Sequence, residues 1–302
     1  MTYQELWQRL IPLYEEREAQ AIIRMVLEAQ FGITLTDIYT GKVNELSRED
    51  VAELDKIMLR LERSEPVQYV LGREFFCGRA FHVAPGVLIP RPETEELCRW
   101  IEADYNHPYC ALQPPVPLRV LDVGTGSGCI AVTLALDLYN SAVIAWDISA
   151  DALLIARENM HQWDAHVELM MEDVLHLSAT AEQLKFDIIV SNPPYICDKE
   201  RTDMAENVLK YEPETALFVP DDDPLRFYRA IAEYGKKALN SGGTIYFETN
   251  PLYTNNVKAM LEALNYTHVE LRTDQFGKQR FVKATQPDRK STRLNSSHRS
   301  LS

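Results

Sequence analysis

The chain has 302 residues, of which 46% are hydrophobic and 25% are charged, and its formal net charge is −14. This composition predicts a globular protein of one large domain or two, with a core that needs no disulfide bonds. The acidic balance argues against a general DNA or RNA binder, because such proteins bind mainly by neutralising phosphates with basic side chains.

Two further classes of protein are disfavoured by the sequence. No stretch approaches the roughly 20 apolar residues of a membrane span, and the opening segment MTYQELWQRLIPLYEE carries acids and no apolar signal core. The cysteines are scattered, odd in number and without metal-type spacing, so we expect no metal site and a reduced, cytoplasmic location. They are Cys77, Cys98, Cys110, Cys129 and Cys197.

The first part of the chain has the apolar periodicity of helices. Residues 17–32 place Ala21, Ile22, Met25, Val26 and Ala29 on one helix face, and a glycine follows as a stop. Residues 47–66 carry a second apolar stripe with the same spacing, formed by Val51, Leu54, Ile57, Met58 and Leu61. These patterns predict a small helical domain over residues 1–72.

The character of the sequence changes after this domain. Aromatic and β-branched residues around Gly78 predict a hairpin connector over residues 73–90. A helix is expected over residues 94–106, followed by a proline-rich loop over residues 107–118.

From residue 118 onward, strand and helix patterns alternate. Such alternation predicts parallel βαβ units in an α/β, doubly wound sheet with helices on both faces. We assign residues 91–286 to this domain, with a hairpin around Gly277 as its last element, and residues 287–302 to a disordered tail. The expected strands are 118–124, 142–149, 166–173, 186–191 and 243–249, and the expected helices are 127–139, 150–163 and 225–240.

A glycine-rich turn follows the first of these strands, in the stretch VLDVGTGSGCIAV. Its glycines, Gly124, Gly126 and Gly128, allow positive φ and let the backbone approach a ligand at the carboxyl ends of the strands. A generic tight turn is the simpler alternative. A dinucleotide site is disfavoured, because that fingerprint is G-x-G-x-x-G and position 129 is a cysteine.

Two acids at later strand ends favour an adenosine-bearing ligand. Asp147 closes the second strand, where a carboxylate can accept hydrogen bonds from both hydroxyls of a ribose. Its alternative role is to cap the next helix, although Ser149 is also available for that. Asp173, after the third strand, is placed to meet an adenine amino group, and its alternative is an ordinary loop acid.

The glycine turn, preceded by Asp122 and followed by Asp147, resembles the cofactor site of class I S-adenosylmethionine methyltransferases. The resemblance implies a seven-stranded sheet, S-adenosyl-L-methionine as cofactor, and an acid at position 122 near the charged methionine part. The cofactor-binding residues that it implies are Asp122, Gly124, Thr125, Gly126, Ser127, Gly128, Asp147, Asp173, Val174 and Asn192.

The stretch IVSNPPYI ends an apolar central strand in a rigid polar corner. Asn192 and the carbonyl of Pro193 can each accept one N–H of a planar NH2 group, and Tyr195 offers a flat ring. We therefore predict Asn192, Pro193 and Tyr195 as the catalytic residues. A proline turn with no role in chemistry is the alternative.

N-P-P-Y resembles the signature of methyltransferases that act on planar nitrogens, in nucleic-acid adenine or in protein glutamine. Residues 65–97, which include LIPRPETE, and residues 211–218, YEPETALF, resemble the bacterial release factor glutamine methyltransferases. That family methylates the glutamine of the Gly-Gly-Gln motif in peptide chain release factors. The resemblance implies a release factor as partner, no stable nucleic acid, no membrane and a monomer, with a helical domain that helps hold the release factor.

The substrate-binding residues that this resemblance implies are Asn192, Pro193, Pro194, Tyr195, Arg91 and Thr94. For Arg91 and Thr94, a connector that merely orients the domains is an equal alternative. Two other functions stay open at this point: an adenine methyltransferase acting on DNA or RNA, and a non-catalytic adapter with a methyltransferase fold. No basic channel or target-recognition segment supports the first, and the intact glycine turn argues against the second.

Overall fold

The computed structural model describes residues 1–106 and 116–288. Most of the predicted proline-rich loop and of the predicted disordered tail lies outside the described residues. The chain forms two compact units. The first contains Met1–Glu74, Val83–Pro85 and Met204–Glu212, and the second contains Phe75–His82, Gly86–Asp203 and the chain from Pro213 onward.

The first unit is helical. A shared apolar core, to which Leu27, Leu54 and Leu61 contribute, holds its helices together. The elements of the N-terminal segment are α1 (Tyr3–Gln8), α2 (Glu16–Phe31), α3 (Leu35–Tyr39), the 3-10 turn η1 (Lys42–Glu45), α4 (Arg48–Leu61) and α5 (Val67–Leu71). Helix α2 ends at Gly32 in the left-handed region, with a φ of 64°, as the sequence predicts.

The predicted face of α2 is partly wrong. Ala21 and Met25 are exposed, whereas Ile23 and Leu27 are fully buried beside Ile22 and Val26. Helix α2 contacts both α1 and α5, and its buried stripe is displaced from the predicted one because packing against neighbouring helices decides which face is covered. In α4, four of the five predicted side chains are buried and only Val51 is half-buried.

A segment distant in the sequence also belongs to the helical unit. Helix α9 (Glu206–Tyr211) is bonded to the end of the N-terminal helices, because the Tyr211 hydroxyl donates to the Arg63 carbonyl at 2.8 Å. The Lys210 ammonium donates to the same carbonyl at 3.2 Å. The helical unit therefore extends beyond residues 1–72 in sequence.

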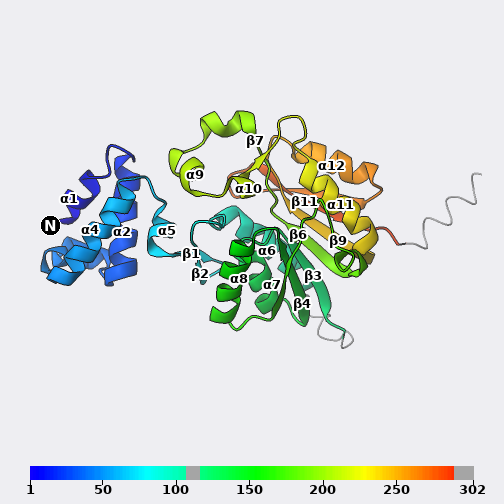
Figure 1. Cartoon of the computed structure of the whole chain (residues 1–302), viewed down its shortest axis with the longest axis horizontal. Coiled ribbons are helices and arrows are strands. Elements are labelled where there is room, and N and C mark those ends of the chain that lie inside the picture. Colours follow the sequence, from blue (N-terminus) through cyan, green and yellow to red (C-terminus); the bar gives the residue numbers. More distant parts are fainter. Residues whose placement is uncertain (107–115, 289–302) are drawn as a thin grey trace, which may run out of the picture. The chain divides into compact units, whose positions relative to one another are not determined.

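The second unit is built on a seven-stranded sheet in the order β10-β11-β9-β6-β3-β4-β5. Figure 1 labels its strands β3, β4, β6, β9 and β11. The strands β3, β4, β5, β6 and β9 are parallel, and β10 and β11 add an antiparallel pair at one edge. The predicted α/β fold class, with seven strands and a helical N-terminal domain, is confirmed. Strand bounds are β3 (Leu118–Val123), β4 (Ser141–Asp147), β5 (Val167–Met171), β6 (Phe186–Ser191), β9 (Leu239–Glu248), β10 (Thr267–Thr273) and β11 (Gln279–Thr285).

Helices cover both faces of this sheet, as Figure 1 shows. One face packs against α6 (Pro92–Tyr105), α7 (Cys129–Asp137) and α8 (Ala150–Gln162), and the other against α11 (Arg226–Ala238) and α12 (Thr254–Ala263). Strand β6 is apolar on both sides because Ile188 and Val190 enter one core and Ile189 enters the other.

The smaller elements differ most from the predictions. Helix α12 was not predicted, because only Thr254, Val257 and Leu261 are buried and this stripe is short. Two further sheets have two strands each. One consists of β1 (Arg73–Phe76) and β2 (Arg79–His82), and the other of β7 (Ile196–Cys197) and β8 (Phe218–Val219). The remaining elements are the 3-10 turns η3 (Ala181–Gln183) and η4 (Asp198–Asp203) and helix α10 (Glu214–Leu217). Across the described residues, no helix has the length and apolar character needed to cross a membrane.

We predict that Gly235→Ala destabilises the protein by about 1–3 kcal/mol. A methyl group there would lie 2.5 Å from the Tyr266 hydroxyl oxygen, and that hydroxyl donates to the Ala232 carbonyl at 2.8 Å. This steric cost outweighs the roughly 1 kcal/mol by which alanine normally favours a helix over glycine. Urea unfolding measures the change. In a Tyr266→Phe background the same substitution should cost less, and an equal cost in both backgrounds would contradict the steric explanation.

Candidate active site

The glycine turn joins the end of β3 to the start of α7 in a left-handed backbone conformation. The φ angles of Gly124, Gly126 and Gly128 are 75°, 54° and 80°. The turn is tied to the end of β4, because the N–H groups of Gly124 and Thr125 each donate to the Trp146 carbonyl at 2.9 Å. A Cβ on Gly128 would lie 3.1 Å from the Cβ of Ala156 on α8, so close helix packing also requires glycine there.

Asp147 connects this turn to the next strand end. Its Oδ2 accepts from the Gly126 N–H at 2.8 Å, and its Oδ1 accepts from the Ser149 N–H at 2.9 Å. Ser149, rather than Asp147, is the N-cap of α8 and accepts from the Ala152 N–H at 3.2 Å. A carboxylate has about four acceptor positions, so Asp147 retains capacity for hydroxyl donors from a ligand.

A cavity of about 340 Å³ opens at the carboxyl ends of the parallel strands. It lies where the strand order reverses, since β3 is followed by β4 and β5 on one side and by β6 on the other. In open α/β sheets, ligands bind at such a point. The predicted site residues that line it are Gly124, Gly126, Asp147, Asp173, Val174, Asn192, Pro193 and Pro194.

Other predicted site residues are not part of the cavity lining. Asp122, at the end of β3, and Thr125 and Ser127, within the turn, are buried, and Thr94 is buried on α6. Arg91 is the N-cap of α6, and Tyr195 is half-buried against the core beneath α11. The roles predicted for these residues and for those in the lining stay predictions.

Several lining residues were missed by the sequence analysis. They come from the segment before α6, from α10 and β8, and from α11: Gly86, Val87, Leu88, Pro213, Thr215, Ala216, Phe218, Phe227 and Ile231. The stretches that contain Val87 and Ala216 were identified by resemblance, but nothing in their periodicity distinguishes a cavity wall from ordinary core.

Asp122 is a fully buried acid directly behind the glycine turn. Its Oδ2 accepts from the Thr125 hydroxyl at 2.6 Å, while its Oδ1 has no hydrogen-bond partner within residues 1–106 and 116–288. Burial raises the pKa of Asp122 to about 7, and the neighbouring Asp147 adds to the effect. A buried acceptor without a partner, next to a cavity wall, suits a ligand that carries positive charge.

Asp173 lines the cavity beside Val174. Its Oδ1 accepts from the Leu175 N–H at 2.9 Å, and its Oδ2 pairs with His176 Nδ1 at 2.8 Å. These two contacts lower the pKa of the Asp173 carboxyl against the opposing effect of burial. The group is therefore held as an acceptor at the cavity edge.

The N-P-P-Y corner begins where β6 ends, and its backbone is fixed on several sides. The Ser191 hydroxyl donates to the Val123 carbonyl at 2.6 Å, which joins the ends of β6 and β3. The Tyr195 N–H donates to the Leu217 carbonyl at 3.2 Å, and the Asn250 side chain donates to the Tyr195 carbonyl at 3.2 Å. The corner is therefore held rigidly beside the glycine turn.

The side chain of Asn192 is held from behind by residues on two other elements. Its Nδ2 donates to the Thr94 hydroxyl oxygen at 3.2 Å, and the Thr94 hydroxyl donates to Glu248 Oε2 at 2.7 Å. The Tyr195 hydroxyl donates to Glu248 Oε1 at 3.3 Å. Glu248, at the end of β9, is only 1% exposed and was not predicted as a site residue.

Burial strongly affects the acid–base properties of this cluster. It raises the pKa of Glu248 to about 7, although the Thr94 hydroxyl and the Arg280 guanidinium act in the opposite direction. Burial also raises the pKa of Tyr195, and the nearby Glu248 carboxylate raises it further. Perturbed groups of this kind are frequent at functional sites.

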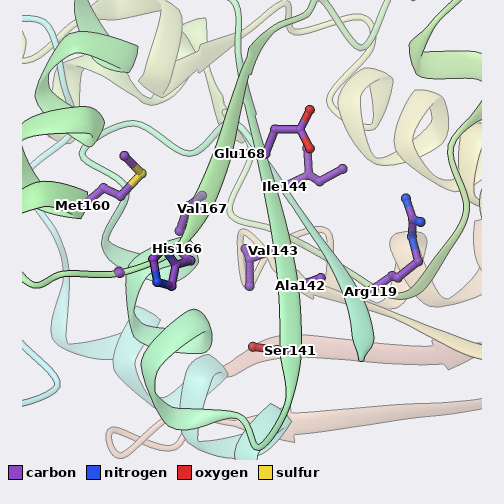
Figure 2. Close-up of a pocket in the computed structure, with 10 residues that line it drawn as sticks. Arg119, Ser141, Ala142, Val143, Ile144, Met160, His166, Val167 and Glu168 are labelled. Atoms are coloured by element: carbon purple, nitrogen blue, oxygen red, sulfur yellow. The ribbon is translucent and has the colours of Figure 1, made fainter. Parts of the chain in front are cut away.

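A second, shallower pocket lies at the other end of the sheet, where β3, β4 and β5 begin. Its volume is about 510 Å³, larger than that of the first cavity, but none of the predicted site residues lines it. Figure 2 shows Arg119, His166 and Glu168 spread around this pocket without converging on a common point. The cavity at the carboxyl ends of the strands is therefore the better candidate site.

The comparisons with known proteins agree with this geometry. The family model described as the PrmC N-terminal domain matches residues 5–72, and the Methyltransferase small domain matches residues 111–216. The release factor glutamine methyltransferase of Bacteroides thetaiotaomicron is 46% identical over 92% of this chain and 96% of its own length. The chain belongs to the release factor glutamine methyltransferase family. The predicted enzyme class and cofactor are confirmed with it: the protein is an S-adenosylmethionine-dependent methyltransferase.

Two further relatives are similar over much of the chain. The release factor glutamine methyltransferase of Flavobacterium psychrophilum is 37% identical over 91% of this chain and 95% of its own length. A solved structure of protein-(glutamine-N5) methyltransferase (release factor-specific) from Alicyclobacillus acidocaldarius is 26% identical. It covers 68% of this chain and 99% of that one, with a TM-score of 0.41.

We predict that Asp122→Asn removes part of the pH dependence of stability. Because the pKa of Asp122 is raised from 3.8 to about 7 in the folded protein, folding binds a proton between these values. Its contribution to the free energy of unfolding therefore falls as pH rises through this window and is constant above it. As the pH rises from about 5 to about 8, the free energy of unfolding of the variant should increase by about 3 kcal/mol relative to that of the unsubstituted protein.

Urea unfolding of both ligand-free proteins at the two pH values measures this difference. Glu248 titrates in the same range with the same sign in both proteins, so the comparison isolates Asp122. Parallel pH dependences in the two proteins would contradict the raised pKa of Asp122.

Proposed function

We propose that this protein transfers a methyl group from S-adenosylmethionine to the side-chain amide nitrogen of the glutamine in the Gly-Gly-Gln motif of peptide chain release factors. The observation that carries the proposal is the position of Asn192. Asn192 and Pro193 line the same cavity as the glycine turn and Asp147. The similarity to release factor glutamine methyltransferases supports the same substrate.

The cavity residues fit the cofactor in the roles that the family resemblance implies. Asp147 would accept hydrogen bonds from the ribose hydroxyls, and Asp173 and Val174 would border the adenine. The unpartnered oxygen of Asp122 would face the charged methionine part through the glycine turn. The cofactor supplies an electrophilic methyl group on a sulfonium centre.

The protein's own contribution is to orient a poor nucleophile. The lone pair of an amide nitrogen is delocalised, so it reacts only when the N–H bonds are held in a suitable direction. Asn192 Oδ1 and the Pro193 carbonyl would each accept one N–H, and the rigid corner fixes both acceptors. Such positioning can contribute on the order of 7–11 kcal/mol to the reduction of the barrier.

The partner and setting of the reaction are part of the proposal. The helical unit would help hold the release factor while its glutamine enters the cavity. The enzyme would act as a monomer in the cytoplasm, without stable binding to nucleic acid. The acidic net charge of −14 supports a protein substrate over a nucleic acid.

Transfer of labelled methyl from S-adenosylmethionine tests this function directly. The substrates are intact release factor, the same factor with its Gly-Gly-Gln glutamine replaced, and duplex DNA. Label on the intact factor alone is the expected result. Label on DNA would favour an adenine methyltransferase, and the absence of label on all three, with cofactor still bound, would reject the proposed substrate.

We predict that Asn192→Ala lowers kcat by about 10²–10³-fold, the usual effect of losing one preorganised hydrogen-bonding group. The variant should fold and bind S-adenosylmethionine, because the turn and Asp147 are unchanged. Steady-state transfer to release factor, thermal unfolding and calorimetric cofactor binding measure these properties. Asn255→Ala, on the exposed side of α12, is the matched control and should retain full turnover. A near-normal kcat in Asn192→Ala would reject the assigned role.

A further inference from the structure

Three side chains from separate elements form a hydrogen-bonded chain behind the cavity. Asn192 follows β6, Thr94 is on α6, and Glu248 ends β9. Thr94 and Glu248 are 3% and 1% exposed, and neither lines the cavity. They therefore act on a substrate through side chains of the N-P-P-Y corner and not by direct contact.

We propose that Thr94 and Glu248 are positioning residues, which hold the Asn192 side-chain amide with its carbonyl oxygen toward the substrate nitrogen and its NH2 group away from it. This inference rests on the proposed function and deepens it, because it assigns the groups that make Asn192 an acceptor.

The direction of the chain follows from counting donors and acceptors. An ionised carboxylate only accepts hydrogen bonds, so the Thr94 hydroxyl must use its single hydrogen toward Glu248, at 2.7 Å. The Thr94 oxygen is then left with acceptor positions only. It can pair with the NH2 group of Asn192, at 3.2 Å, but not with the Asn192 carbonyl. The two ends of the amide are thereby distinguished.

The Tyr195 hydroxyl supports the role of Glu248 as an acceptor, because it bonds to the second carboxylate oxygen. It donates to Glu248 Oε1 at 3.3 Å, so both carboxylate oxygens receive a hydrogen bond from a hydroxyl. Tyr195 and Asn192 belong to the same N-P-P-Y corner. Glu248 is therefore connected to this corner twice, once directly and once through Thr94.

The opposite orientation of Asn192 would be unproductive. Its NH2 group would then face the NH2 group of the glutamine substrate, two donors with no acceptor between them. A protonated Glu248 permits this orientation, because its hydroxyl can donate to Thr94 and free the Thr94 hydrogen for the Asn192 carbonyl. The acceptor state of the site thus depends on the charge of Glu248.

The charged and titratable groups around Glu248 leave its charge only partly balanced. Arg280 on β11 acts on it favourably, but the Arg280 Nε is bonded to Asp274 Oδ2 at 2.9 Å. Glu93 on α6 opposes its ionisation. On its remaining side, the Tyr228 hydroxyl of α11 donates to the backbone carbonyl of Glu248 at 3.2 Å. Because the pKa of Glu248 is raised to about 7, its proton is exchanged close to neutral pH.

A purely structural role is the competing explanation, since the Thr94 hydroxyl also joins α6 to β9. The two roles differ in what they change. Loss of a structural bond lowers thermal stability and cofactor binding, whereas loss of positioning lowers kcat and leaves the affinity for S-adenosylmethionine unchanged.

The first test compares three threonine variants with the full-length enzyme acting on intact release factor. Thr94→Val removes the hydroxyl at constant shape and should lower kcat by about tenfold to a hundredfold, with unchanged cofactor affinity. Thr94→Ser should recover most of that loss, because serine restores the hydroxyl. Thr244→Val is the matched control: it removes a buried hydroxyl on β9, where Thr244 accepts from the Tyr105 hydroxyl at 3.1 Å, and should leave kcat unchanged.

The second test is the pH profile of kcat. With the unsubstituted enzyme, kcat should fall as pH decreases through about 7, as Glu248 gains its proton. Glu248→Gln, which cannot ionise, should have a kcat lowered by about tenfold to a hundredfold. In an Asp122→Asn background, which removes the other buried acid with a pKa near 7, Glu248→Gln should also abolish the fall of kcat toward acid pH.

The outcomes separate this inference from the proposed function. If the unsubstituted enzyme transfers methyl to release factor and Thr94→Val has normal kcat, the positioning role is rejected and the function stands. Equal losses in Thr94→Val and Thr94→Ser, or an acid limb preserved in Glu248→Gln in the Asp122→Asn background, would also reject it. An unsubstituted enzyme that binds cofactor but does not label release factor would overturn both proposals.

Discussion

The reversal of strand order between β3 and β6 is the constraint on which the site depends. Connections from β3 proceed toward β4 and β5, and the chain then returns to the other side of β3 as β6. The glycine turn after β3 and the N-P-P-Y corner after β6 are thereby adjacent, although about 65 residues separate them in sequence. The Ser191 hydroxyl bonds directly to the Val123 carbonyl at 2.6 Å at this point. The glycine turn and the N-P-P-Y corner therefore line one cavity, where the proposed function places the cofactor and the substrate amide.

Two buried acids lie near the carboxyl ends of the strands on either side of β6. Asp122 belongs to β3 and Glu248 to β9, on either side of β6. Burial raises the pKa of each to about 7. Keeping carboxyl groups in such places opposes folding at neutral pH, because the charged form is poorly solvated. Asp122 has an unpartnered oxygen behind the cavity, and Glu248 is the proposed positioning residue for Asn192. In both places a carboxyl group that lowers the free energy of unfolding at neutral pH stands where the proposed function requires a negative charge.

Glu248 and Thr94 also explain how a flexible amide becomes a directional group. An asparagine side chain can present either its oxygen or its nitrogen, and its rotation alone does not decide between them. A carboxylate at the end of a short chain of hydrogen bonds decides it, because the carboxylate is an acceptor only. Because Thr94, Asn192 and Glu248 come from α6, β6 and β9, this chain of hydrogen bonds requires that these three elements pack firmly against each other. The aromatic contact between Trp100 and Tyr246, with ring centroids 5.6 Å apart, joins α6 to β9 in the same core.

The sequence by itself determined the alternation of strands and helices, the glycine turn, the polar corner after β6 and the family. These features are local, since each depends on periodicity, turn chemistry or a short motif. It did not determine the buried face of α2, helix α12, or the assignment of α9 to the helical unit, because these depend on neighbours distant in the chain. Likewise Val87 and Ala216 resemble ordinary core residues in sequence, and Glu248 resembles an ordinary polar residue at the end of a strand. Only the folded sheet decided that two of them line the cavity and the third stands behind Asn192, because strand order and helix packing bring distant segments together.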